Sequence, residues 1–161
     1  MRLQPCRIVV EPSAWATATT SASRESGRET GGVLLGWRQS AGVCVSEFFE
    51  VPDGRSTHFS YMRRHAAAAQ HLTDALDSLP EGSPEGYVGE WHTHPAPQGP
   101  SRTDRNQLKQ ISKQCQATVA LIVLAHDPAT GQWEPRGLCG RSGGAGLALI
   151  EIRPPRPKEH K

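Results

Sequence analysis

The stretch YVGEWHTHPAPQGPSRTD, residues 87–104, concentrates the side chains of this chain that are best suited to catalysis. His92 and His94 are two residues apart in a segment typical of a β-strand, so both imidazoles are expected to point to one face. Asp104 follows ten residues after His94, beyond a loop rich in Pro and Gly and at the start of a helical pattern. Two imidazoles and one carboxylate suit zinc, and three protein ligands leave a fourth position for water. The sequence therefore predicts a catalytic zinc site.

Each part of this stretch also has an ordinary structural interpretation. A His-x-His pair alone is weak evidence for a metal, because histidines are common in strands and loops. The segment SRTD is also typical of a helix N-terminus, with Ser101 as the N-cap and Asp104 approximating a capping box. The two roles are compatible, since one Asp104 oxygen can bind the metal while the other accepts a backbone N–H. The coincidence of all three parts in one short span favours the metal.

A hydrolytic zinc site also needs a base, commonly a carboxylate outside the ligand set. Glu90 is one candidate, because it lies two residues before His92 and on the same face of the predicted strand. Glu29 is the other, at the start of the segment ETGGVLLGW. Spacing alone favours Glu90, and only three-dimensional packing could bring Glu29 to the site.

The elements that must position these residues follow from hydrophobic patterning and turn signals. Strands are predicted at residues 7–11, 29–37, 42–51, 87–94, 117–125, 131–140 and 146–152. Helices are predicted at residues 12–25, 61–79 and 101–115. The pattern indicates an α+β domain, with a central mixed sheet of about six or more strands flanked by about three helices in an α/β/α sandwich-like arrangement.

Length and charge narrow the class of protein. At 161 residues the chain suits one domain, residues 1–152, followed by a basic, Pro-rich tail at residues 153–161 that we expect to be mobile. A net charge of +2 is too small to indicate nucleic acid or a membrane surface as a partner. The start lacks the apolar core of a signal peptide, and the longest apolar run, residues 119–125, is too short to span a bilayer. We therefore expect a cytoplasmic protein.

The remaining cysteines and histidines have simpler interpretations. The four cysteines are scattered without a C-x-x-C pair, which does not suggest a disulfide-stapled fold or a structural zinc site. Cys44 and Cys115 are interpreted as small buried hydrophobic residues. Three further histidines are interpreted as ordinary residues on or near the central helix, namely His58, His65 and His71.

The segments ETGGVLLG, GEWHTHP and PSRTD together resemble the JAMM/MPN, or JAB-domain, zinc metalloprotease family, over residues 7–152. The compact chain is similar to the short bacterial type, which is associated with ubiquitin-like conjugation systems, including antiphage ones. The resemblance implies a JAB/MPN-type, cytidine-deaminase-like fold, with zinc bound by the two histidines and Asp104. It also implies that Glu29, rather than Glu90, is the general base, and that Ser101 donates a hydrogen bond to the oxyanion. The loop before Ser101 is one residue shorter than is usual in the family.

The function that the resemblance implies is that of a deubiquitinase-like isopeptidase or peptidase. It would cleave after the C-terminal glycine of a ubiquitin-like protein, either in a precursor or in a conjugate with a target. The implied partners are that modifier and the activating (E1-like) and conjugating (E2-like) enzymes of the same system. Two alternatives stay open: a maturation protease for a small sulfur-carrier protein, and a non-catalytic MPN interaction module.

Overall fold

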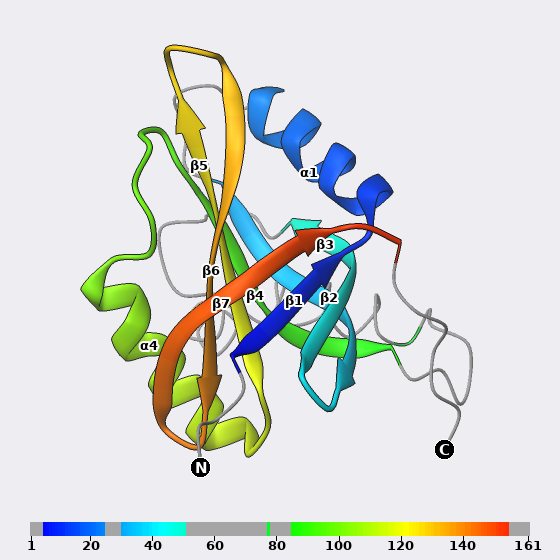
Figure 1. Ribbon diagram of the computed structural model, residues 1–161, viewed down its shortest axis with the longest axis vertical. Coiled ribbons are helices and arrows are strands. Elements are labelled where there is room, and N and C mark those ends of the chain that lie inside the picture. The colour runs from blue at the N-terminus through cyan, green and yellow to red at the C-terminus, as the bar shows by residue number, and fades with distance from the viewer. Residues whose placement is uncertain (1–4, 25–29, 51–76, 78–84, 155–161) are drawn as a thin grey trace.

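The computed structural model describes residues 5–24, 30–50, 77 and 85–154, which form seven strands and two helices (Figure 1). In chain order the elements are β1 (Cys6–Val10), α1 (Pro12–Arg24), β2 (Gly31–Gln39), β3 (Gly42–Glu50), β4 (Gly86–His94), α4 (Arg102–Cys115), β5 (Val119–Asp127), β6 (Gln132–Arg141) and β7 (Gly144–Ile152). Neither helix in these ranges has the length and apolar character needed to cross a membrane.

The seven predicted strands and two of the three predicted helices are confirmed, each within about two residues of the expected bounds. Pro12 opens α1, which its fixed φ favours, and buries the small face of Ala14, Ala18 and Ala22. A two-residue turn at Ser142 and Gly143, both with positive φ, joins β6 to β7 as a hairpin. The helix predicted at residues 61–79 lies outside the described residues.

The sheet is mixed, as predicted, but it closes on itself, so the prediction of an α/β/α sandwich is wrong in this respect. Its strand order is β1-β3-β2-β4-β5-β6-β7, and β7 pairs in parallel with β1 to complete the closure. This last pairing sets Cys6 opposite Ala148 and Val10 opposite Ile152. Pairing between the first and last strands leaves no local mark in a sequence, because each strand keeps its alternation in an open or a closed sheet.

The side chains of β5 divide between two hydrophobic clusters, one of which contains residues of α1 and the other residues of α4. Ile122 and Leu124 belong to the cluster beneath α1, which also contains Ile8, Val45, Phe48 and Trp91. Val119, Leu121 and Val123 belong to a second cluster, with Leu108 and Ile111 of α4. Since successive side chains of a strand alternate between faces, β5 divides the interior into an α1 side and an α4 side.

Helix α4 is fixed closely to the β6–β7 hairpin. A Cβ at Gly140 would lie 3.0 Å from atoms of Leu108 and Ser112 of α4, so glycine lets the helix approach β6 closely without displacing these neighbours. The Gly143 N–H donates to the buried Ser112 hydroxyl (3.2 Å), and the Arg105 guanidinium donates to the Ala145 carbonyl (2.9 Å). These contacts set the position of the N-terminus of α4 relative to the sheet.

A disulfide joins Cys6 of β1 to Cys139 of β6, two cysteines that sequence analysis left unpaired. The residues are 133 apart in the chain, and both are buried. Strand β7 pairs with β1 on one side and with β6 on the other, and it thereby brings these two strands close together. Cys44 and Cys115 are free; Cys44 is buried, as predicted, and Cys115 is half-buried.

Candidate metal centre

Strand β4 carries both candidate histidines on its α4 side. His92 is opposite Val123 of β5, whose side chain packs in the α4 cluster, and His94 is opposite Ala125. The two rings are tilted against each other with centroids 4.8 Å apart, and their Nε2 atoms are 3.2 Å apart. The i, i+2 spacing on a strand therefore aims two imidazole nitrogens at one point, as the sequence predicts.

The N-terminus of α4 brings Asp104 to the same point. Asp104 Oδ2 lies 3.3 Å from His92 Nε2 and 3.9 Å from His94 Nε2. The three ligand atoms thus form a triangle with edges of 3.2, 3.3 and 3.9 Å. A tetrahedral zinc ion with ligands at about 2.0–2.1 Å has ligand atoms about 3.3 Å apart. The triangle has the size of one face of such a tetrahedron, so these residues fit a zinc ion.

The site is open enough for a fourth ligand. The side chains of the three residues keep 15–20% of their surface exposed, so they are neither sealed in the core nor fully solvated. A structural zinc ion is usually enclosed by four protein ligands, whereas a catalytic one keeps a position for water or substrate. Three converging ligands with one accessible side match the second case.

A backbone carbonyl favours one tautomer of His94. Its Nδ1 lies 3.2 Å from the carbonyl oxygen of Gln98, in the loop between β4 and α4. A carbonyl can only accept, so Nδ1 carries the proton and the neutral ring keeps its Nε2 lone pair for a metal. Such a partner behind the ligand fixes both the tautomer and the orientation of the ring. Sequence analysis missed Gln98, because a main-chain contact leaves no side-chain signal.

The capping box that the sequence predicts is present, with one difference. The Asp104 N–H donates to Ser101 Oγ (3.1 Å), and the Ser101 N–H donates to Asp104 Oδ2 (2.8 Å). The prediction assigned the two carboxylate oxygens to separate roles, but Oδ2 both accepts the backbone bond and faces the imidazoles. A carboxylate oxygen has two lone-pair directions, so one atom can serve both.

Asp104 is held in its ionised form. Burial alone would raise its pKa, but the hydrogen bond and charge of His92 and the hydrogen bonds of Ser101 outweigh this effect and lower the pKa to about 2. The carboxylate is therefore charged at neutral pH, as a metal ligand must be.

Ser101 is suitably placed to act as a hydrogen-bond donor. Its Oγ accepts the Asp104 N–H, which leaves the hydroxyl hydrogen available for another acceptor. It is exposed at the N-terminus of α4, where the helix dipole favours negative charge. The loop that is one residue shorter than is usual in the family still brings Ser101 to the N-cap position.

Glu29 lies outside the described residues, but its neighbour in the chain, Thr30, is tied to the site. The Thr30 N–H donates to Thr93 Oγ1 (2.9 Å), and the Thr93 N–H donates to the Thr30 carbonyl (2.9 Å). Thr93 is the residue between the two histidines, and both threonines are buried. The chain next to Glu29 is therefore fixed against the metal-ligand strand, a relationship that spacing alone could not reveal.

Glu90, the rival base, shares the α4 side of β4 with His92 but lies nearer the C-terminal end of α4. It is buried, and its charge contributes to raising the pKa of Tyr87 and of Cys115, for both of which burial is the main cause. Cys115 ends α4 and is eleven residues after Asp104, about 16 Å along the helix axis. Glu90 thus acts near the C-terminal end of α4, whereas the ligands lie at its N-terminal end.

Comparisons with known proteins agree with this geometry. Residues 12–135 match the Prok-JAB family, described as prokaryotic homologs of the JAB domain. A protein of Sinorhizobium fredii (strain NBRC 101917 / NGR234), named "Probable metalloprotease y4qB", is 28% identical over 144 residues, which are 85% of each chain. The solution structure of protein DSY2949 from Desulfitobacterium hafniense has a similar fold, with a TM-score of 0.60 and 17% identity over 91% of this chain and 92% of that one. The resemblance predicted from the motifs is confirmed, and the chain belongs to the family of prokaryotic homologs of the JAB domain.

Proposed function

We propose that this protein is a zinc-dependent peptidase whose metal is bound by His92, His94 and Asp104. The observation that carries the proposal is the triangle of ligand atoms, with edges of 3.2–3.9 Å, at a partly open site. The name of the Sinorhizobium relative, a probable metalloprotease, supports the same class of activity.

When bound, the zinc ion supplies Lewis acidity, which lowers the pKa of water toward neutrality and polarises a carbonyl group. Glu29 takes the proton of the attacking water and returns it to the departing amine. Thr93 supports this step by holding Thr30, and with it the chain beside Glu29, against β4. Ser101 donates its hydroxyl hydrogen to the carbonyl oxygen as negative charge develops there.

The substrate that we propose is a ubiquitin-like protein, cleaved after its C-terminal glycine, and the family resemblance supports this choice. A glycine tail suits a centre at the end of a strand, because a backbone without side chains can approach the ligands closely. The same resemblance suggests a bacterial conjugation system with E1-like and E2-like enzymes in the cytoplasm, with antiphage defence as one setting.

Two fusions of one ubiquitin-like β-grasp protein test this proposal. The first joins its C-terminal glycine to a reporter through a peptide bond, and the second joins it to a lysine side chain through an isopeptide bond. The zinc-loaded protein should cleave at the glycine, and a chelator should abolish cleavage. Cleavage of the peptide fusion alone would favour the maturation protease. Zinc binding without cleavage of either fusion, across several β-grasp proteins, would favour the interaction module and contradict the enzyme.

A further inference from the structure

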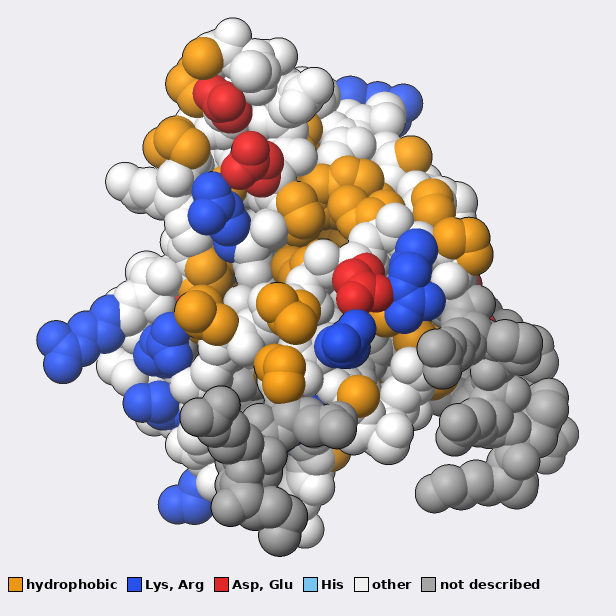
Figure 2. Space-filling view, viewed as in Figure 1, with side chains coloured by type: hydrophobic (Ala, Val, Ile, Leu, Met, Phe, Trp, Pro, Cys, Tyr) orange, Lys and Arg blue, Asp and Glu red, His pale blue; other side chains and the backbone are white. Residues whose placement is uncertain are grey.

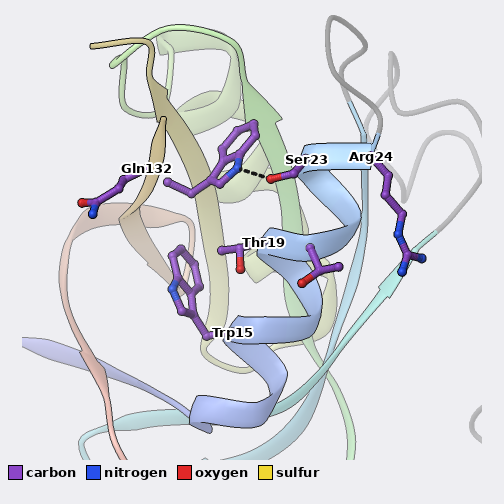
Figure 3. A pocket seen from close by; sticks show the side chains of 7 residues that line it. Trp15, Thr19, Ser23, Arg24 and Gln132 are labelled. Atoms are coloured by element: carbon purple, nitrogen blue, oxygen red, sulfur yellow. Dashed lines mark hydrogen bonds between the residues drawn. The ribbon is translucent and has the colours of Figure 1, made fainter. Parts of the chain in front are cut away.

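An open groove lies between α1 and the start of β6, away from the metal centre. Trp15, Thr19, Ser23 and Arg24 of α1 line it together with Gln132 and Trp133 of β6 (Figure 3), and its volume is about 700 Å³. In the view of Figure 2 hydrophobic side chains gather in a hollow at this place, between α1 and the end of the β5–β6 hairpin. We call it the Trp15–Trp133 groove.

Contacts behind the two indoles hold them in place. Trp133 donates its Nε1–H to Ser23 Oγ (3.0 Å), and its ring lies 4.7 Å from the ring of His126. Trp15 packs edge-on against Phe48, with ring centroids 6.3 Å apart. Both indoles are only half-buried, so each keeps part of its surface open to the groove. The groove therefore has two rigid aromatic walls, with small hydroxyl side chains between them.

Aromatic walls of this kind suit a proline-rich segment. A polyproline II helix is already extended before binding and presents proline rings to aromatic side chains, as in the recognition of PxxP motifs. It also has backbone carbonyls without internal partners, so its binding site needs hydrogen-bond donors. Ser23, Gln132 and Arg24, whose side chains carry such donors, are among the residues that line the groove.

The chain contains such a segment, in the RPPRPKEHK sequence at residues 153–161. Pro154 and Pro157 are three residues apart, one turn of a polyproline II helix, and would therefore lie on the same side. The segment leaves the sheet beside the groove, because the Arg153 N–H donates to the Val10 carbonyl (3.1 Å), two residues before α1 begins. Figure 1 shows the end of β7 next to the first turn of α1, the turn that carries Trp15.

The groove along α1 and the C-terminal segment also match in length and in charge. Trp15 and Arg24 are nine residues apart on α1, about 14 Å along its axis. Pro154 and Glu159 are five residues apart, about 15 Å in a polyproline II helix. Glu159 is the only acidic residue of the tail, and Arg24 is the only charged side chain among the described residues that line the groove. With Pro154 at the Trp15 end, Glu159 would lie level with Arg24 along the axis of α1.

We propose that the Trp15–Trp133 groove binds the Pro154–Glu159 segment of the same chain. Pro154 and Pro157 contact the indoles, Glu159 pairs with Arg24, and the basic side chains of the tail point to solvent. The tail that sequence analysis predicts to be mobile is then docked along α1. This inference does not depend on the metal centre or on the proposed peptidase activity.

Backbone relaxation of the ¹⁵N-labelled full chain tests this proposal. We expect order parameters of about 0.8 for Arg156, Lys158 and Glu159, whereas a free tail would give values below about 0.6. Replacing both Pro154 and Pro157 by Ala should bring these values down to those of a free tail. Pro155→Ala is the matched control, because Pro155 lies a third of a turn away from that side, and it should leave the tail ordered.

The ion pair has its own test. Arg24→Glu and Glu159→Arg should each lower the order parameter of residue 159, and the double variant should restore it. Tail order parameters below about 0.6 in the unaltered chain would overturn the proposal. Identical indole N–H signals of Trp15 and Trp133 in the full chain and in a chain ending at Arg153 would also overturn it. A tail signal that changes with protein concentration would assign the contact to a second copy and overturn binding within one chain.

Discussion

Thr30 and Thr93 are joined by two hydrogen bonds of 2.9 Å, one from the Thr30 N–H to Thr93 Oγ1 and one from the Thr93 N–H to the Thr30 carbonyl, which link the residue after Glu29 to the residue between His92 and His94. The Thr93 hydroxyl also lies 3.4 Å from the Thr30 carbonyl. Thr93 is 2% exposed, so its side chain is not accessible to a substrate. We therefore assign it a positioning role between the proposed base and the proposed metal ligands.

Thr93→Val should keep the zinc content and lower turnover. The change preserves side-chain volume but leaves the buried Thr30 N–H without its acceptor, which costs about 1–3 kcal/mol of unfolding free energy. Metal analysis, urea denaturation and cleavage assays measure the three effects. Thr93→Ser, which keeps the hydroxyl, should recover most of the turnover. Full activity in the Val variant would show that this link does not position the base.

His92→Ala and Asp104→Ala should each release zinc, because two ligands rarely hold the ion that three hold. Mass spectrometry of protein-bound metal after dialysis measures this. Asp104→Ala also removes the capping-box acceptor of the Ser101 N–H, which should lower the free energy of unfolding by about 1 kcal/mol. His126→Ala is the matched control, since His126 contacts Trp133 instead of the centre, and it should keep its zinc. Zinc content equal to that of the unaltered protein in either ligand variant would contradict the ligand set.

Glu29→Gln should retain zinc and lose cleavage, because the proposed base is removed while all three proposed ligands stay. Glu90→Gln is the comparison that decides between the two candidate bases. Glu90 acts near Tyr87 and Cys115, at the far end of α4, so its variant should keep most of the turnover. The reverse result, with Glu90→Gln inactive and well folded and Glu29→Gln active, would reassign the base.

Ser101→Ala should retain zinc and slow turnover by a factor on the order of 10², as for the loss of an oxyanion donor. It also removes the N-cap of α4, at a cost of about 1 kcal/mol. Ser101→Gly separates the two effects, because glycine is a tolerable N-cap without a hydroxyl. We expect it to be nearly as stable as the unaltered protein and as slow as the Ala variant, while Ser101→Thr should restore turnover. A fast Gly variant would remove Ser101 from the proposed mechanism.

Reduction of the Cys6–Cys139 disulfide should lower the free energy of unfolding. The bond closes a loop of 133 residues, for which the chain-entropy model gives about 5 kcal/mol, and measured effects commonly fall at about 2–4 kcal/mol. Urea denaturation with and without a reductant measures the loss, and a Cys6→Ser/Cys139→Ser variant should show no further response to reductant. Cys115→Ala should respond to reductant as the unaltered protein does. Equal midpoints under both conditions would show that the bond contributes nothing.

The parts of the centre that depend on local spacing could be predicted from the sequence. The His92 and His94 pair follows from the two-residue period of a strand, and Asp104 follows from the capping pattern of SRTD. The parts that depend on distant pairing could not. Closure by β1 and β7 joins the two ends of the described chain, and the disulfide is a consequence of that closure. Likewise, the Gln98 carbonyl acts through the main chain, so no residue type marks it.

Asp104 Oδ2 is shared between the Ser101 amide and the imidazole pair. The stability of the first turn of α4 therefore depends on whether the metal site is occupied. An ion drawn to that oxygen competes for the same electron density as the amide proton, so cation affinity and helix fraying are coupled. Because the ion and the amide compete for one oxygen, thermodynamic reciprocity requires that breaking the Ser101 hydrogen bond strengthens ion binding by the same factor by which ion binding weakens that bond. Arg105 of the same turn donates to the Ala145 carbonyl, so this turn also contacts β7, the last strand of the sheet.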